Sequence, residues 1–177
     1  NTKPGKTIKF EEDPIFLDPR CTDLGARIVI NLEKLHLSTK KLKLKISNVN
    51  DYYQLSHSLG IPSSGTENFQ NKVFGLETNS EELNAIDFKK GCYVGQENTA
   101  RMKLKEKISR RIYTIEIIEG NIDLDEVIKV DNNEIGKIIN NSNFPFGLFK
   151  FKDSKFKLDE ILTTNKAKIK VKKPFWV

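Results

Sequence analysis

The sequence predicts an α+β protein that ends in a small antiparallel β-barrel domain. Two observations support this prediction. From Ser109 onward the 177-residue chain alternates apolar and polar residues in short runs separated by turn residues, which is typical of antiparallel strands. Before that point, apolar residues at helical spacing alternate with short extended runs. We therefore place a domain boundary between residues 1–107 and residues 108–177.

Three short segments of the first region are expected to be strands. Segments 15–17 and 26–31 flank a turn that begins at Asp18 and Pro19, residue types that favour turns. In segment 42–46 apolar residues alternate with lysines, which is the period of a half-buried strand.

Three other segments of the first region are expected to be helices. The first is capped by Asn50 or Asp51 and ends at Gly60. In segment 79–86, Asn79 and Glu82 have the spacing of a capping pair. Segment 96–105 follows a glycine and is the third predicted helix.

The second region contains the strands of the predicted barrel. The runs are R-I-Y-T-I-E-I-I (111–118), V-I-K-V-D-N-N-E-I-G-K-I-I (127–139), F-G-L-F-K-F-K (146–152) and A-K-I-K-V-K-K (167–173). The second of these runs contains a hairpin around residues 131–134, because Asp and Asn are common turn residues.

Composition limits the class of protein. Apolar residues make up 37% of the chain and charged residues 31%, as expected of a globular protein. No apolar run approaches the roughly 20 residues of a membrane helix, so we expect no membrane partner. Two cysteines, Cys21 and Cys92, are too few for a disulfide framework. We expect a reducing compartment: the cytoplasm of a bacterium, or the mitochondrial matrix if the source is eukaryotic.

The net charge of +6 raises the alternative of a nucleic-acid-binding module, for instance one directed to tRNA. Segment 101–111 has six cations and one acid, but no aromatic residue follows until Tyr113. It therefore lacks the stacking platform of a single-strand binder. A contact with phosphate or polyglutamate at this segment is left open, whereas the other basic residues are spread along the chain like those of a solvated surface.

The octapeptide K-G-C-Y-V-G-Q-E, residues 90–97, is the strongest candidate for a functional site. It places Cys92 between Gly91 and Gly95, and glycine allows both unusual backbone angles and close approach of a ligand. The neighbouring cation Lys90 favours a reactive thiol. Cys92 is thus a candidate nucleophile, redox thiol or cluster ligand. The alternative is a buried turn in which Cys92 is a small apolar residue.

Neighbouring residues do not settle this choice. His36 and His57 lie far from Cys92 in sequence, which disfavours a Cys/His hydrolase, and no Cys/His cluster has the spacing of a metal site. Glu97 and Arg101 are four residues apart on the expected helix, and an ion pair between them is an alternative that explains both residues without a functional role. We interpret Cys21 as structural.

The octapeptide resembles the signature of the YgfZ-type folate-binding proteins, relatives of the glycine cleavage T-protein (aminomethyltransferase). Further segments resemble the same family in the same order. They are D-P-R-C-T-D-L-G-A-R (18–27), L-G-I-P (59–62), L-E-T-N (76–79), L-N-A-I-D-F-K-K-G-C-Y-V-G-Q-E (83–97) and T-A-R-M-K (99–103). The motif that contains the cysteine is specific, and the shorter ones add weight as a series.

The resemblance implies a partial T-protein-like folate-binding region in residues 1–107, followed by the barrel domain in 108–177. It implies a folate-binding accessory protein for iron–sulfur cluster assembly or repair. Such a protein works with cluster-assembly proteins or client enzymes and is not itself a turnover enzyme. The alternative within the same fold is a tetrahydrofolate-dependent aminomethyltransferase. The resemblance also implies that this chain is the C-terminal part of a longer protein.

The resemblance assigns the site as well. Cys92 is the catalytic residue, no resident metal is expected, and tetrahydrofolate is the expected cofactor. The residues expected to bind this cofactor are Glu77, Asn79, Lys90, Tyr93, Gln96, Glu97 and Arg101. Glu77 stands where relatives bind the pterin donors with a carboxylate; alternatively it is an acid at a helix N-terminus.

Three segments depart from the family pattern. Ser56 stands where relatives usually have Arg, and P-S-S (62–64) replaces P-E-G. After Met102, where relatives usually read K-H-R-G, Lys103 is followed by L-K-E. The loss of the Arg weakens the case for a tight folate site.

Overall fold

The computed structural model describes residues 6–105 and 108–176. The chain forms two compact units, residues 1–55 and 56–177. The boundary expected after residue 107 coincides with residues 106–107, which lie outside the described part of the chain, so it stays a prediction.

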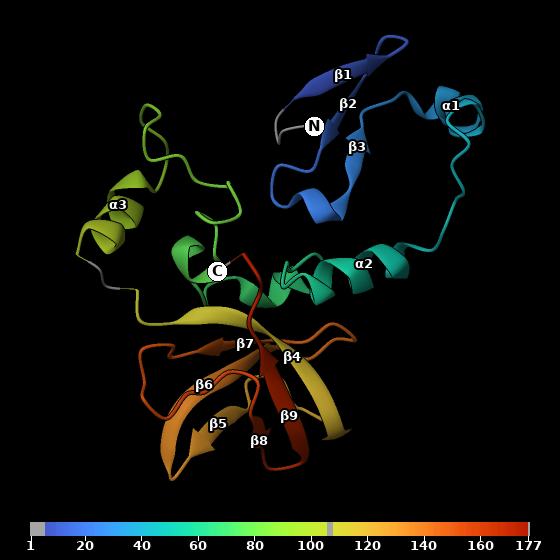
Figure 1. The fold of residues 1–177 in the computed structure, drawn as a ribbon. Coiled ribbons are helices and arrows are strands. Elements are labelled where there is room, and N and C mark those ends of the chain that lie inside the picture. Colours follow the sequence, from blue (N-terminus) through green and yellow to red (C-terminus); the bar gives the residue numbers. More distant parts are fainter. Residues whose placement is uncertain (1–5, 106–107, 177) are drawn as a thin grey trace. The chain divides into compact units, whose positions relative to one another are not determined.

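The first unit contains a three-stranded antiparallel sheet and helical segments (Figure 1). The strands are β1 (Thr7–Phe10), β2 (Asp13–Leu17) and β3 (Ala26–Ile28), in that order in the sheet. The helical segments are η1 (Thr22–Leu24), η2 (Leu32–Lys34), α1 (Leu35–Lys41) and the first part of α2 (Val49–Ser58), which runs on into the second unit.

Asp18 organises the turn between β2 and β3. Its buried carboxylate accepts hydrogen bonds from Arg20 Nε at 3.1 Å and from Arg27 Nε at 2.7 Å. Arg20 also donates to the Tyr52 hydroxyl at 2.6 Å. Burial would raise the pKa of Asp18, but the hydrogen bonds from both arginines lower it to about 2. The D-P-R motif is therefore a charged structural turn.

Two expectations for the first unit were wrong. Segment 42–46 forms no strand: α1 ends at Lys41, Lys43 has φ 53°, and Ile46 is 80% exposed. An alternating pattern forms a strand only where a neighbouring strand pairs with it. The cap of α2 is Asn48, whose side chain accepts from Asn50 N at 2.9 Å, and not Asn50 or Asp51.

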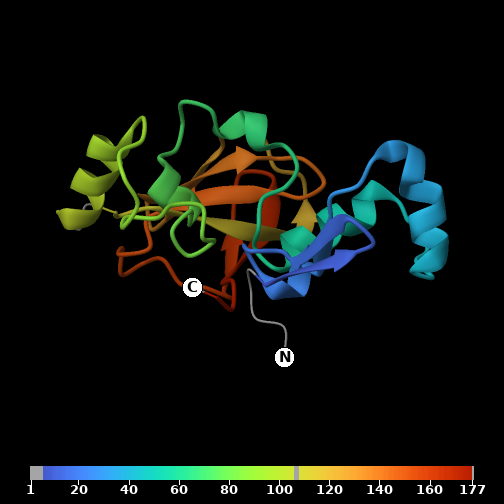
Figure 2. The same ribbon diagram turned by 90° about the horizontal axis from the view of Figure 1, so that it is seen from above.

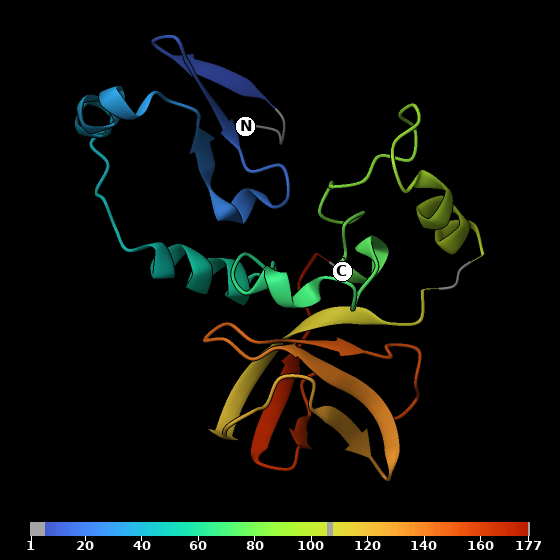
Figure 3. The same ribbon diagram turned by 180° about the vertical axis from the view of Figure 1, so that it is seen from behind.

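The second unit is built on a six-stranded antiparallel sheet in the order β5-β6-β7-β4-β9-β8. Its strands are β4 (Arg111–Gly120), β5 (Val127–Val130), β6 (Asn133–Asn140), β7 (Phe146–Phe149), β8 (Ile161–Thr163) and β9 (Ala167–Lys172). The edge strands β5 and β8 approach each other, so the sheet nearly closes into a barrel, as Figure 3 shows from behind. The expected antiparallel sheet is confirmed.

The hairpin expected at 131–134 also forms. Val130 pairs with Asn133, and both intervening residues, Asp131 and Asn132, have positive φ. This two-residue geometry matches the right-handed twist of the flanking strands.

The sheet has a core on its inner face and a smaller cluster on its outer face. Fully buried side chains such as Ile115, Ile138 and Phe149 belong to the inner core. Outside, Ile139 and Leu148 pack with Phe69 of η3 (Thr66–Phe69).

Segment 79–105 extends from one end of this sheet (Figures 1 and 2). The helix expected at 79–86 does not form. Instead the short helix η4 (Gly75–Thr78) ends at Asn79, which has φ 59°, and turns follow. The next helix, α3 (Gln96–Leu104), matches the expected helix at 96–105 to within one residue.

Candidate functional site

Cys92 lies in an open loop on the segment between η4 and α3. The thiol-bearing residue is exposed. A Cβ atom added to Gly91 or to Gly95 would meet nothing within 4 Å, so the backbone on both sides of the cysteine is also open to an approaching molecule. The alternative of a buried turn is therefore not what the structure shows.

The end of this loop is fixed by the start of α3. Gly95 is the N-cap of the helix and has φ 85°, an angle that side chains disfavour. Gln96 Oε1 accepts a hydrogen bond from Tyr93 N at 3.2 Å, and Thr99 Oγ1 donates to Gly95 O at 3.0 Å. The second glycine of the octapeptide thus turns the chain into the helix and leaves Cys92 outside it.

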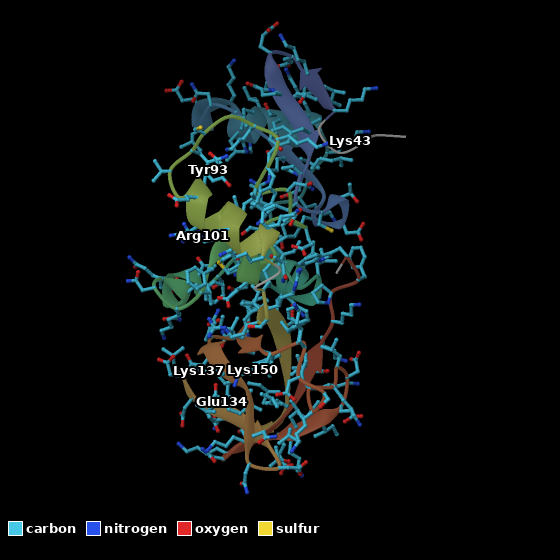
Figure 4. The ribbon with its side chains drawn as sticks, turned by 90° about the vertical axis from the view of Figure 1, so that its left-hand side faces the viewer. Lys43, Tyr93, Arg101, Glu134, Lys137 and Lys150 are labelled. Carbon is cyan, nitrogen blue, oxygen red and sulfur yellow. The ribbon has the colours of Figure 1, made fainter. Side chains whose placement is uncertain are left out.

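Lys90 and Tyr93 form a contact across Cys92. The Lys90 ammonium lies 4.7 Å from the centre of the Tyr93 ring, a cation–π distance. The Tyr93 hydroxyl is buried and has no hydrogen-bond partner among the described residues. A buried hydroxyl without a partner costs free energy, so this group is an available donor in the loop. Figure 4 shows Tyr93 in the loop that precedes α3.

Glu97 and Arg101 form the expected i,i+4 pair on α3. Arg101 Nη2 lies 2.7 Å from Glu97 Oε1, and the two side chains are 57% and 84% exposed. Such an exposed pair contributes only about 0.2–0.5 kcal/mol and leaves both groups accessible. The helix is tied to its surroundings by Lys103, which pairs with Glu81 and lies over the ring of Phe88.

Glu77 is a buried carboxylate whose oxygens are both occupied. Arg110 Nε donates to its Oε1 at 2.8 Å, and Phe74 N donates to its Oε2 at 3.0 Å. This arrangement joins η4 to the residue that precedes β4.

Asn79 is buried in the same way. Its Nδ2 donates to Ile112 O at 3.2 Å, and its Oδ1 accepts from Arg111 Nη1 at 2.8 Å. Arg111 also pairs with Glu82. Sequence reasoning did not identify Arg110 and Arg111 as partners, although two arginines directly before an apolar strand were a usable signal.

The predicted site residues therefore fall into two groups. Lys90, Tyr93 and Gln96 surround Cys92, and α3 adds the Glu97–Arg101 pair. Glu77 and Asn79 belong to a separate buried network with the two arginines. Among residues 6–105 and 108–176, no cluster of three or more His, Cys, Asp or Glu side chains is arranged to hold a metal ion.

Ser56 and Ser63, two positions that depart from the family pattern, are in contact. Ser56 is fully buried, donates to Ile61 O at 2.6 Å, and its Oγ lies 2.6 Å from Ser63 Oγ. The two positions expected to differ from the family pattern therefore lie side by side in this fold, as a pair of hydroxyls.

His57 is not an ordinary surface histidine. Its Nε2 lies 2.9 Å from Pro145 O, and its ring packs against Phe144 and Phe146. Burial lowers the pKa of His57, so the neutral ring is favoured, with Nε2–H donating to Pro145 O. The residue lines a cavity of about 590 Å³ beside β4.

Comparison with known proteins identifies relatives of the chain. No protein-family model matches it. A mitochondrial iron–sulfur cluster assembly factor IBA57 homolog of Neurospora crassa is 36% identical over 95 residues, which are 54% of this chain and 21% of the relative. The homolog from Dictyostelium discoideum is 31% identical over 126 residues, 68% of this chain and 31% of the relative. These proteins are homologues of the chain.

Human iron–sulfur cluster assembly factor IBA57, also mitochondrial, is 28% identical over 105 residues, 59% of this chain and 29% of the relative. The chain spans less than a third of the length of each of these three relatives.

The fold has a solved counterpart. The glycine cleavage system aminomethyltransferase T from Bartonella henselae superposes with a TM-score of 0.62 over 95% of this chain and 50% of that chain, at 13% identity. The structure thus resembles the T-protein fold, as expected. Within the described residues, no helix is both long and apolar enough to cross a membrane.

Proposed function

We propose that this chain is part of a YgfZ-type accessory protein for iron–sulfur cluster assembly or repair, with Cys92 as its reactive centre. The observation that supports this most directly is the exposed thiol of Cys92 between two glycines whose surroundings are open. The homologues named as iron–sulfur cluster assembly factors support the process. Because they are named mitochondrial, the matrix is the proposed compartment if the source is eukaryotic.

The chemistry follows from a single accessible thiol. Cys92 loses its proton to solvent when its sulfur bonds to an iron atom of a cluster in transit. One thiolate does not complete the ligand set of an iron atom, and no second set of ligands is gathered around it in the described residues. The other ligands would come from the cluster-assembly protein or client enzyme that is the partner. Cys92 would therefore hold a cluster transiently during transfer.

Tetrahydrofolate binding stays a prediction, and two of its proposed ligands, Glu77 and Asn79, already have protein partners. The polar atoms of Glu77 and Asn79 are occupied by Arg110, Arg111 and backbone groups. A pterin at this position would have to share these oxygens with their protein donors. Lys90, Tyr93, Gln96, Glu97 and Arg101 are the more accessible candidates, because they belong to the exposed loop and to α3.

The test of the proposed function is complementation of cells that lack the protein. The protein that contains this chain is expressed with Cys92→Ser or with Cys21→Ser, and the activity of a [4Fe–4S] enzyme is measured. We expect the first variant to fail and the second to restore activity at equal protein levels. Full enzyme activity with Cys92→Ser would overturn the proposal.

A further inference from the structure

A small cavity on the outer face of the sheet is surrounded by cations from four separate segments. It has a volume of about 180 Å³ and lies in the second unit. Its charged lining residues are Lys72, Arg110, Glu134, Lys137 and Lys150, and its floor is formed by Gly136, Ile139 and Leu148. Figure 4 shows Glu134, Lys137 and Lys150 next to one another on this face.

The strand register explains why these side chains converge. Lys137 of β6 pairs with Leu148 of β7, so their side chains lie on the same face of the sheet. Lys150 lies two residues after Leu148 and shares that face. Lys72 approaches from the loop that follows η3, and Arg110 from the residue before β4. The cavity is thus assembled by the fold and is not a run of neighbouring charges in sequence.

One carboxylate already lies between two of these cations. Asp125 Oδ2 is 2.8 Å from Lys72 Nζ, and its Oδ1 is 3.0 Å from Lys137 Nζ. Hydrogen bonds from both lysines lower the pKa of Asp125. The two ammonium groups are therefore spaced so that a single oxyanion bridges them.

The cations are not fully neutralised by the acids around them. Lys150 Nζ is 3.6 Å from Glu134 Oε1, a long ion pair, and Arg110 is bound to the buried Glu77. The four cations of the cavity are therefore paired with only three carboxylates, those of Asp125, Glu134 and Glu77. The lining cations are each between 32% and 43% exposed, so a ligand from solvent can reach them.

We propose that this cavity binds the phosphate group of an anionic ligand. The proposal is independent of the function proposed for Cys92. A phosphate offers more charge and more acceptor oxygens than a carboxylate, which suits donors that approach from four segments. The small volume fits one charged group and excludes a large ligand, since sites for drug-sized molecules usually exceed about 300 Å³. Asp125 acts as a tethered competitor for Lys72 and Lys137.

The test is a titration of the isotope-labelled chain with inorganic phosphate at constant ionic strength, followed by amide chemical shifts. Lys137→Met combined with Lys150→Met should weaken binding about tenfold or more, because two of the four cations that would donate charge-assisted hydrogen bonds to the phosphate are removed. The matched control, Lys166→Met combined with Lys168→Met, removes the same charge from other ion pairs and should leave binding within about twofold.

A second pair of variants tests for an increase in phosphate affinity. Asp125→Asn removes the competing carboxylate and should tighten phosphate binding. Glu119→Gln removes the same charge from an ion pair with Lys168 of β9 and should leave phosphate binding unchanged. Equal tightening by both variants would show a general charge effect and overturn the proposal. An unchanged phosphate affinity in the Lys137/Lys150 variant would also overturn the proposal. Acetate binding as tight as phosphate binding would overturn it as well.

Discussion

The indole Nε1 of Trp176 donates a hydrogen bond to Leu59 O at 2.6 Å, joining positions that are 117 residues apart. Leu59 lies just after α2, where Gly60 has φ 76° and ends the helix. A Cβ atom at Gly60 would lie 2.5 Å from Pro174 Cγ, so the C-terminal segment packs directly on this turn. The two ends of the second unit are thereby held together.

Trp176→Phe should lower the free energy of unfolding of the second unit by about 1 kcal/mol, because the Leu59 carbonyl loses its donor. The measurement is urea unfolding followed by circular dichroism, since the chain has one tryptophan and the variant has none. Phe175→Leu is the control, because Phe175 is 68% exposed. An equal loss in both variants would contradict the role of the indole hydrogen bond.

Asp18 should make the first unit sensitive to acid. Its pKa in the folded state is lowered from 3.8 to about 2, so its stabilising contribution is present above pH 3.8 and is lost as the pH falls towards 2. The contribution above that range is roughly 2 kcal/mol. The protection of amide hydrogens in residues 13–28 against exchange, relative to the intrinsic exchange rate at each pH, should fall over this pH range in the wild-type chain. In Asp18→Asn exchange should already be fast at neutral pH; slow exchange there would refute the prediction.

Cys92 should react with iodoacetamide faster than Cys21, because Cys92 is exposed and Cys21 is only partly so. Mass spectrometry of the native chain at successive times gives both rates in one experiment. A repeat in denaturant is the control, and there the two rates should converge. Faster modification of Cys21 in the native chain would contradict the assignment of Cys92 as the accessible thiol.

Glu77→Gln should destabilise the second unit by about 1.5–3 kcal/mol, because it weakens the buried bonds to Arg110 and Phe74 N. Glu119→Gln breaks an exposed pair with Lys168 and should cost less than about 1 kcal/mol. Urea unfolding followed by Trp176 fluorescence measures both. If Glu77→Gln leaves stability unchanged, the carboxylate is not structural, and the pterin assignment becomes the better explanation of its burial.

The sequence predicted the second unit better than the first for a physical reason. In β9 the alternate residues Ala167, Ile169 and Val171 all lie in the inner core, and Tyr113 and Ile115 of β4 do the same. The period of two therefore identifies the inner face of these strands correctly. In segment 42–46 the same period has no neighbouring strand, and the chain forms none.

The Cys92 motif was recognisable because it is local in sequence, but the sequence left a buried turn open, and only the structure shows that the thiol is exposed. The role of Asn79 was not predictable. Its capping pattern suggested a helix, but its side chain bonds to Ile112 and Arg111, more than thirty residues away. Tertiary hydrogen bonds of this kind override a local cap signal, and no pattern within one segment reveals them.

The contact between Ser56 and Ser63 predicts that the two positions are energetically coupled. Ser56→Arg alone should destabilise the second unit by about 3 kcal/mol or more, because it places a charge at a fully buried position without a partner. Ser63→Glu alone should also destabilise it, by about 1–3 kcal/mol. In the double variant the two charges can pair, because the two side chains are in contact.

A double-mutant cycle by urea unfolding measures this coupling, with Trp176 fluorescence as the signal. We expect the double variant to be more stable than the sum of the single changes predicts, by about 1–3 kcal/mol. Ser56→Arg combined with Ser142→Glu is the control, because Ser142 bonds to Asn140 and Phe144 and not to Ser56. Strict additivity for the Ser56/Ser63 pair would show that the two positions are energetically independent and would contradict the prediction.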